Sequence, residues 1–424
     1  MKLFFKSLFL LFQFGLFEIS VSQESLAPAS FIRVESGGKK LPTQIAEAQQ
    51  RFQRDQDGDR FWIGYALTIR DGFDFDEIYI HDNGGITISR GGKGDFFIHE
   101  DDEGEIEEAA AESEESRNVI QYNVDQIAVF LQLQARTLQI KKITASNFSR
   151  KKVFRDAPGY WLSEVESGDS FTYLAETISN ASYNKKIIEP ALCLISLHDH
   201  PQAIPFLTHT AGGDQHIEIR KSAAFWLGQI PVEASFTTLV QLFEKEQEFE
   251  MKEHLVFAIG QHGSEKVIGQ LEKIARSRED FDIREKAVFW IGQIERDDAL
   301  DVLIELMKIS GSELKEKIVF SISQHKSERA APLLIEIAES DRDREVRKQA
   351  IFWLGQMASK RTLHALGDIV ESADETETKE QAVFAISQHA DHDEAFDMLM
   401  DIAKHNPNPE VRKEGDFLAE SNRR

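Results

Sequence analysis

The sequence predicts a mainly α-helical protein, an α-solenoid of helix pairs preceded by a small β-rich amino-terminal domain. An eleven-residue helical phrase recurs every 31 to 33 residues through the second half of the chain, with a basic residue second and phenylalanine seventh. A fixed period of this length suits two short helices and two turns, the unit of a stacked helical array. Before residue 150, short runs of β-branched and aromatic residues between turn residues are instead typical of strands.

Each copy of the phrase has one apolar face. In the fifth copy, Val346, Ala350 and Leu354 share one side of a helix. A second apolar helix follows each copy, for example at residues 300–308 and 332–339. Two amphipathic helices cannot bury their apolar faces alone, so we expect neighbouring pairs to stack. The seven copies begin at Ile219, Met251, Ile283, Leu314, Val346, Thr378 and Val411.

The ends of the array also follow from the period. Counting back from the first copy gives a diverged copy that ends near His198, and an earlier helix is expected at 170–182. The last copy carries Asp416 and Glu420 where other copies carry apolar or small residues, which is typical of a terminal cap. We therefore assign residues 156–424 to the solenoid, with the turn at 156–159 as its boundary.

A second period lies inside the first, because bulky and small residues alternate from copy to copy. Alternating sizes let successive layers interdigitate, which favours packing over a tryptophan-lined ligand site. Histidines alternate with apolar residues just beyond the phrase in the same way, and we expect each to cap the end of its helix. The alternating positions are Trp226, Ala258, Trp290, Ser321, Trp353 and Ala385, and then Ile230, His262, Ile294, His325, Met357 and His389.

The phrase resembles the HEAT repeat, in particular the short variety first described in phycobilin lyases. The motif is closest at Val346-Arg347-x-x-Ala350-x-x-x-Leu354-Gly355, and the resemblance covers roughly residues 163–424. It implies that the second helix of each pair lines a concave side, and that the basic column braces acidic turn residues of adjacent repeats. The motif specifies architecture strongly and function hardly at all.

Residues 23–155 predict a β-rich domain. We expect a helix at 41–55, strands at 60–70, 77–81, 86–90 and 95–99, and strand-like structure at 127–144. Asp82-Asn83-Gly84-Gly85 predicts a hairpin turn between the second and third strands. Ten carboxylates and no basic residue occupy 100–115, so we expect a disordered acidic insert at 100–116 whose deletion leaves the melting temperature nearly unchanged.

Residues 1–22 predict a signal peptide. Lys2 and Lys6 precede an apolar run at 7–17, and the small residues at 20–22 suit cleavage before Gln23. An uncleaved anchor is the alternative interpretation. We therefore expect an exported protein, periplasmic or extracellular. The single cysteine, Cys193, permits no intramolecular disulfide and falls in the aromatic column of the repeat, so we interpret it as a core residue.

Composition and motif searches predict no enzyme, cofactor or metal site. The formal net charge of −24 opposes nucleic-acid binding and favours a basic or neutral partner. The three histidines of the second period lie two repeats apart, too far to share one metal ion. His198-Asp199-His200 is a weak metal candidate, and residues 55–59 lack the spacing of a calcium loop. No phosphate-binding loop or hydrolase motif occurs in the sequence.

Two columns of the phrase are the candidate partner-binding residues. The phenylalanine column is interpreted either as packing between repeats or as a hydrophobic ladder for an extended partner. The third residue of each copy should project from the concave face, and four of these six residues are acidic. The two columns are Phe225, Phe257, Phe289, Phe320, Phe352 and Phe384, and Lys221, Glu253, Glu285, Glu316, Lys348 and Glu380.

These patterns predict an exported, non-enzymatic scaffold that binds a protein or peptide through the concave face of the solenoid. The alternative is a regulatory or accessory subunit of an envelope enzyme system, with a ligand site in the β-rich domain. An intrinsic lyase-type enzyme is a third class, suggested only by the family that the repeat resembles.

Overall fold

The computed structural model describes residues 27–28, 30–35, 38–73, 77–81, 85–90, 94–98, 126–146, 154, 156–180, 184–357, 359–389 and 393–421. The chain forms two compact units, residues 1–200 and 201–424. The expected signal peptide at 1–22 and the expected acidic insert at 100–116 lie outside the described residues.

The first unit contains a mixed sheet, which has eight strands in the described residues. The first three strands in the spatial order run parallel, and each later neighbour pairs antiparallel. In spatial order the strands are β1 (Ile32–Val34), β8 (Gly159–Leu162), β2 (Arg60–Thr68), β6 (Gln126–Gln134), β7 (Ile140–Ser146), β3 (Glu77–Ile80), β4 (Ile86–Arg90) and β5 (Gly94–Ile98).

Strand β2 shows how alternation divides the sheet into two faces. Phe61 stacks on Phe52 of α1 (Leu41–Asp55) with ring centroids 5.3 Å apart, and Tyr65 bonds Ser170 of α2 (Ser167–Asn180). Trp62 points to the opposite face, where it belongs to an aromatic cluster with Phe31, Phe130 and Trp161. The helix at 41–55 and the strands expected from the sequence are present, although residues 82–84 of the expected turn lie outside the described residues.

The end of the first unit differs from the boundary that the sequence suggested at residues 155 and 156. Strand β8 lies between β1 and β2, and α3 (Lys185–Leu197) packs against β7. The compact unit therefore extends to His200. A helix pair can bury an apolar face on a sheet as well as on another pair, and the repeat spacing cannot distinguish these. Glycine is required at residue 159, the first of β8, because a Cβ there would come within 2.2 Å of the Phe31 ring.

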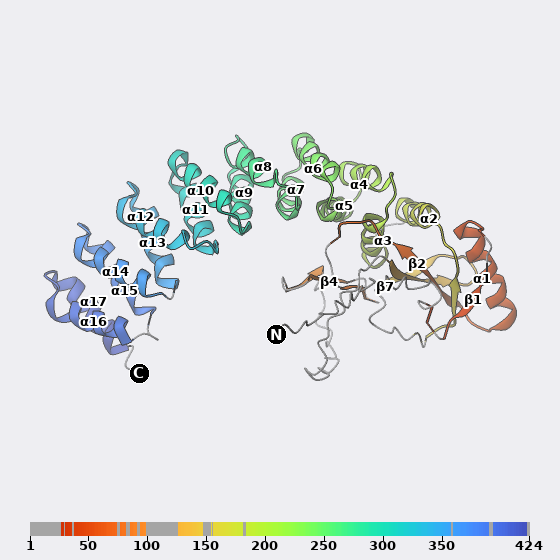
Figure 1. Ribbon diagram of the computed structural model, residues 1–424, viewed down its shortest axis with the longest axis horizontal. Coiled ribbons are helices and arrows are strands. Elements are labelled where there is room, and N and C mark those ends of the chain that lie inside the picture. Colours follow the sequence, from red (N-terminus) through yellow and green to blue (C-terminus); the bar gives the residue numbers. More distant parts are fainter. Residues whose placement is uncertain are drawn as a thin grey trace, which may run out of the picture. The chain divides into compact units, whose positions relative to one another are not determined.

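The second unit is a row of helix pairs, and the described residues of 203–421 form no strand. Figure 1 shows the odd-numbered helices on the inner side of the row and the even-numbered helices on the outer side. The inner helices are α5 (Ile217–Gln229), α7 (Phe249–Gln261), α9 (Phe281–Gln293), α11 (Ser312–Gln324), α13 (Arg344–Gln356), α15 (Thr376–Ser387) and α17 (Pro409–Ser421). The outer helices are α4 (Ala203–Gly212), α6 (Glu233–Lys245), α8 (Val267–Ala275), α10 (Asp297–Ile309), α12 (Ala330–Ser340), α14 (Lys360–Ser372) and α16 (Asp393–His405).

Each copy of the phrase is an inner helix, and consecutive inner helices contact one another. Bulky and small residues alternate at these contacts from one copy of the phrase to the next, as the second period predicts. A Cβ at Gly260 would lie 2.6 Å from the Trp290 ring, whereas a Cβ at Gly355 would lie 2.9 Å from the Ala385 methyl group. Trp226 is only 1% exposed, which agrees with packing as the role of that residue.

The basic column braces the turns, as the resemblance implies. Arg220 pairs with Glu246, and Lys252 reaches Glu279 at 2.8 Å on the following turn. Lys315 reaches Asp341 at 2.7 Å in the same way. These contacts join the inner helix of one repeat to the turn before the next inner helix, so they fix the spacing of the array.

Candidate partner-binding surface

The phenylalanine column lies on the side of each inner helix that faces away from the core. Its rings become more exposed along the array. Phe225 is 6% exposed, whereas Phe352, Phe384 and Phe417 are 41%, 44% and 64% exposed. The rings of Phe257, Phe289 and Phe320 are half-buried.

Aromatic rings of neighbouring inner helices form a continuous strip. Its centroid distances are 6.0 Å from Phe225 to Phe257, 5.3 Å from Phe257 to Trp290, and 6.4 Å from Phe289 to Phe320. Contacts with Trp353 extend the strip from Phe320 to Phe352. We call the rings of Phe225, Phe257, Phe289, Trp290, Phe320, Phe352 and Trp353 the aromatic strip. The column therefore packs between repeats and is also partly open to solvent.

The second candidate column lies in ion pairs between neighbouring inner helices. Glu253 of α7 pairs with Lys286 of α9 at 3.2 Å, and Glu285 of α9 pairs with Lys317 of α11 at 2.8 Å. Two lysines of the column form similar pairs, Lys221 with Glu250 and Lys348 with Glu377. Glu316 and Glu380 are half-buried. These pairs partly compensate the acidic charge that the column alone would give the surface.

The sequence reasoning did not identify Lys286 and Lys317 as part of this surface. Both occupy the fourth position of the phrase, one residue after the column that was singled out. An acid at the third position of one copy and a lysine at the fourth position of the next copy is the signal that could have found these pairs.

The carboxylates raise the pKa of two of these lysines, Lys317 and Lys221. The Glu285 carboxylate raises the pKa of Lys317 above its ordinary value, outweighing a small opposite effect of burial. Burial works to lower the pKa of Lys221, but Glu250 and Glu218 outweigh it and the pKa is raised. Both pairs therefore favour the charged form of the lysine and hold the side chains in place.

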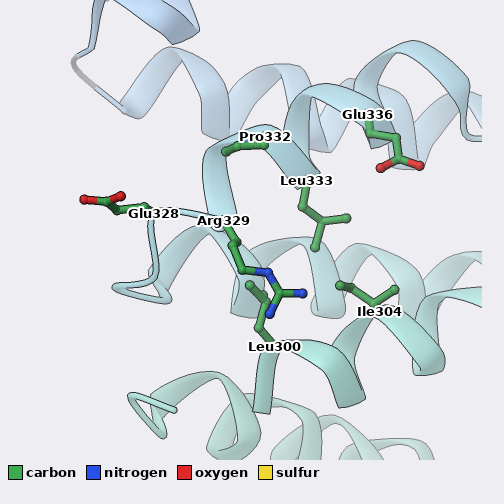
Figure 2. Close-up of a pocket in the computed structure, with 7 residues that line it drawn as sticks. All are labelled: Leu300, Ile304, Glu328, Arg329, Pro332, Leu333 and Glu336. Carbon is green, nitrogen blue, oxygen red and sulfur yellow. The ribbon is translucent and has the colours of Figure 1, made fainter. Parts of the chain in front are cut away.

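An open groove of about 440 Å³ lies on the outer side, between α10 and α12. Figure 2 shows Leu300, Ile304 and Leu333 lining it, with Arg329 reaching across its mouth. Arg329 pairs with Asp301 at 2.6 Å. Four apolar residues and three charged residues, Glu328, Arg329 and Glu336, line the groove.

Three polar side chains in the core of the first unit, Tyr65, Ser170 and His198, form a chain of hydrogen bonds. Ser170 Oγ lies 2.9 Å from the Tyr65 hydroxyl and 3.0 Å from His198 Nε2, and His198 Nδ1 lies 2.6 Å from the Leu194 carbonyl. The carbonyl only accepts, so Nδ1 carries the proton, Ser170 donates to Nε2, and Tyr65 donates to Ser170. Burial lowers the pKa of His198 to about 4. All three side chains are buried, and their hydrogen bonds link β2, α2 and the end of α3 within the first unit.

The rings of His262 and His325 do not form the expected helix caps, because each bonds the turn after its helix and the preceding repeat rather than the last carbonyls of its own helix. His262 follows α7, accepts the backbone N–H of Ser264 at 2.9 Å, and contacts Ser235 Oγ at 3.0 Å. His325 follows α11 and has the same arrangement with Ser327. No group of three metal-ligating side chains is gathered anywhere in the described residues. Within the same residues, every helix is too short or too polar to cross a membrane.

Comparison with protein families matches residues 268–352 and 331–415 to a model of HEAT repeats. Residues 268–415 therefore carry HEAT repeats, and the second unit is an α-solenoid of HEAT-type helix pairs. A comparison with curated protein sequences gives no match.

Solved structures with similar helical arrays share little sequence with this chain. Human deoxyhypusine hydroxylase is 17% identical, with 61% of this chain and 97% of that chain covered and a TM-score of 0.27. The CpcE and CpcF complex of phycocyanin lyase from Nostoc sp. is 13% identical, with 64% and 98% covered and a TM-score of 0.27. Kap95p in complex with RanGDP is 14% identical, with 60% and 40% covered and a TM-score of 0.37. These scores carry no functional argument.

Proposed function

We propose that the protein is an exported, non-enzymatic scaffold that binds a protein or peptide through the inner helices of its HEAT repeats. The observation that carries the proposal is the aromatic strip, because rings that contact one another over several helices remain partly open at one end of the row. Exposed aromatic side chains dominate the energetics of many protein interfaces. Solenoids present such rows along an extended surface.

The surface is preorganised. Ion pairs between inner helices hold Glu253 and Glu285 in place, and ring stacking holds Phe225 and Phe289. Side chains that are already ordered lose little conformational entropy when a partner binds. A partner that is basic or neutral fits the net acidic charge of the chain.

The absence of enzymatic activity is part of the proposal. Its support is that Tyr65, Ser170 and His198, the group that most resembles a catalytic relay, is buried and satisfied internally. Within the described residues, we find no specific observation that favours a ligand site in the β-rich unit over the inner helices.

Export, to the periplasm or the extracellular space, is proposed from the sequence of residues 1–22. Amino-terminal sequencing of protein recovered from the culture medium or the periplasm tests this proposal. We expect the mature chain to begin at Gln23. Recovery of the intact chain, beginning at Met1, only from the cytoplasm would contradict it.

Photo-crosslinking in the native cells tests the binding surface. A benzophenone amino acid is placed at Gln293 or Gln324, which are exposed at the ends of inner helices, and at Glu305 or Glu336 of outer helices as matched controls. We expect a discrete crosslinked polypeptide from the inner positions only. Crosslinks from the outer positions alone would disprove binding through the inner helices.

A further inference from the structure

The aromatic strip contains two closed pairs of phenylalanine rings. Phe225 of α5 stacks on Phe257 of α7 with an interplanar angle of 16°, and Phe289 of α9 stacks on Phe320 of α11 with an angle of 11°. The two pairs are separated by two repeats, as the second period predicts. Within each pair, each ring covers one face of the other. This stacking accounts for the low exposure of the column at the start of the array.

The third pair in this series is open. The same period should stack Phe352 of α13 on Phe384 of α15, but no ring contact joins the two in the described part of the chain. Both rings remain more than 40% exposed, and Phe417 on α17 is more exposed still. We call Phe352, Phe384 and Phe417 the open rings. Three exposed large apolar side chains at the same position of consecutive inner helices are unusual for a solvated surface.

The sequence explains why the series stops there. Trp290 covers Phe257 at 5.3 Å, and Trp353 covers Phe320 at 5.1 Å, in each case from the next inner helix. The corresponding position on α17 is Leu418, so Phe384 has no tryptophan to cover it. The indole that closes the strip elsewhere is absent from its carboxyl-terminal end.

Acidic side chains lie beside the two outermost open rings, Phe384 and Phe417. Glu380 lies one helical turn before Phe384 on the same helix, and Glu414 and Glu420 lie one turn to either side of Phe417. Lys413 is the one basic residue at a matching distance from Phe417. Acids therefore outnumber bases around the two outermost rings, which favours a cationic ligand.

Exposed amides accompany the rings. Gln356 and Gln388 are exposed and lie one turn after Phe352 and Phe384. A glutamine amide both donates and accepts hydrogen bonds, so it can bond the N–H and C=O groups of an extended main chain. Because the open rings occur once per inner helix, a ligand that contacts all of them must run across the helices. An extended segment suits this path.

We propose that the open rings bind an extended peptide segment of a partner protein, one that carries a large apolar side chain flanked by lysine or arginine. The apolar side chain packs against Phe352 and Phe384 and covers the ring faces that direct stacking covers in the closed pairs. The cationic residues lie against Glu380, Glu414 and Glu420. This inference rests on the proposed scaffold function and specifies where the partner binds and by what chemistry.

Selection from a phage-displayed library of random peptides of about 12 residues, with the full chain as target, tests the inference. We expect the enriched peptides to combine a large apolar residue with lysine or arginine. Fluorescence anisotropy then measures the affinity of a synthetic, labelled peptide of the most enriched sequence. The double substitution Phe352→Ser with Phe384→Ser should raise its Kd by about tenfold or more.

A matched control comes from Phe249, which is as exposed as Phe352 but begins α7, away from the open rings. Phe249→Ser should leave Kd within about twofold of the wild type. A second variant, Leu418→Trp, supplies the indole that Phe384 lacks. It should raise the Kd of the peptide by about tenfold while preserving helix content. The Kd of Leu418→Trp is interpreted only if circular dichroism shows the wild-type helix content. If it does not, the Kd of the double serine variant alone tests the binding site.

Two results would overturn the inference. Enriched peptides that are acidic or lack a large apolar residue would exclude the proposed chemistry. Equal affinity for the wild type and the double serine variant would exclude the open rings as the place of binding. If inner positions 293 and 324 still gave crosslinks in cells, the scaffold function would stand and only this site would be wrong.

Discussion

The indole ring of Trp290 lies against Gly260 on the neighbouring inner helix, so close that a methyl group at residue 260 would come within 2.6 Å of the ring. A glycine on one helix thus makes room for a tryptophan on the next. Gly228 and Gly292 instead face the small residues Ala258 and Ser321 on the next helix, and there the glycine permits the two backbones to approach each other. Size alternation between repeats is therefore a direct packing device.

The first prediction uses this contact. Gly260→Ala should destabilise the array by about 1–3 kcal/mol, because the added methyl group overpacks Trp290 by more than the gain in helix propensity, roughly 1 kcal/mol, can offset. Gly269→Ala is the matched control, since nothing lies within 4 Å of a Cβ there. It should leave stability unchanged or raise it by up to about 1 kcal/mol. Urea unfolding followed by circular dichroism measures both, and equal effects would refute the packing argument.

The repeats show what a sequence can predict about this fold. Every inner helix was placed by the phrase, because its apolar residues must all lie on one side, as Val346, Ala350 and Leu354 do. This inference depends only on short-range geometry that repeats many times. The role of the basic column in the turns instead followed from the resemblance to HEAT repeats, and the pair of Lys252 with Glu279 confirms it.

Longer-range pairings were not predictable in this way. Strand β8 is four residues long, and only its partners β1 and β2 reveal that it belongs to the sheet. The ion pairs of Glu253 and Glu285 depend on how far each inner helix is rotated relative to the next. A single helical wheel places these carboxylates on the open side but cannot say what reaches them from the neighbouring helix.

The second prediction concerns the basic column. Arg220 is only 12% exposed, donates to the Ala211 carbonyl at 3.0 Å, and pairs with Glu246 and Glu248. Arg220→Met should cost about 2 kcal/mol, because Glu246 is left without its partner in a poorly solvated place. Arg296→Met, in an exposed pair with Glu265, should cost no more than roughly 0.5 kcal/mol. Thermal unfolding distinguishes them, and similar losses would show that Arg220 contributes no more than a surface residue.

The third prediction is a dependence on pH. Burial lowers the pKa of His198 to about 4, against 6.5 for an ordinary histidine. Between pH 6.5 and pH 4, the His198 ring binds a proton in the unfolded chain but stays neutral in the folded chain. The contribution of neutral His198 to the free energy of unfolding is therefore complete above pH 6.5 and is lost as the pH falls towards 4. The loss should approach about 3 kcal/mol.

His198→Gln tests this dependence, because glutamine can bond both Ser170 and the Leu194 carbonyl but does not titrate. Unfolding of the wild type and the variant is compared from about pH 7 to about pH 4.5, where their stabilities should converge. His254, whose pKa burial also lowers to about 4, is present in both proteins and cancels. Parallel pH profiles for the two proteins would show that His198 does not contribute to acid sensitivity.

The last prediction concerns the charge of the inner surface. Replacing Glu253, Glu285 and Glu316 by lysine should reduce capture of the crosslinked partner by about tenfold, since the surface becomes cationic. Added salt should narrow the difference, because charge repulsion between exposed groups is screened. However, the new lysines at 253 and 285 also face Lys286 and Lys317, so the triple variant loses two ion pairs as well as negative charge.

A charge-swapped variant separates these effects. Adding Lys286→Glu and Lys317→Glu to the triple variant restores both ion pairs in reverse and returns most of the negative charge to the same surface. If surface charge governs binding, the swapped variant should recover most of the capture, with helix content equal in all three proteins. Capture that is unaffected in the triple variant would remove the charge argument. Capture that stays fully lost after the swap would mean that the partner contacts individual carboxylates, Glu316 among them, because both helix-to-helix pairs and two thirds of the charge change are then restored.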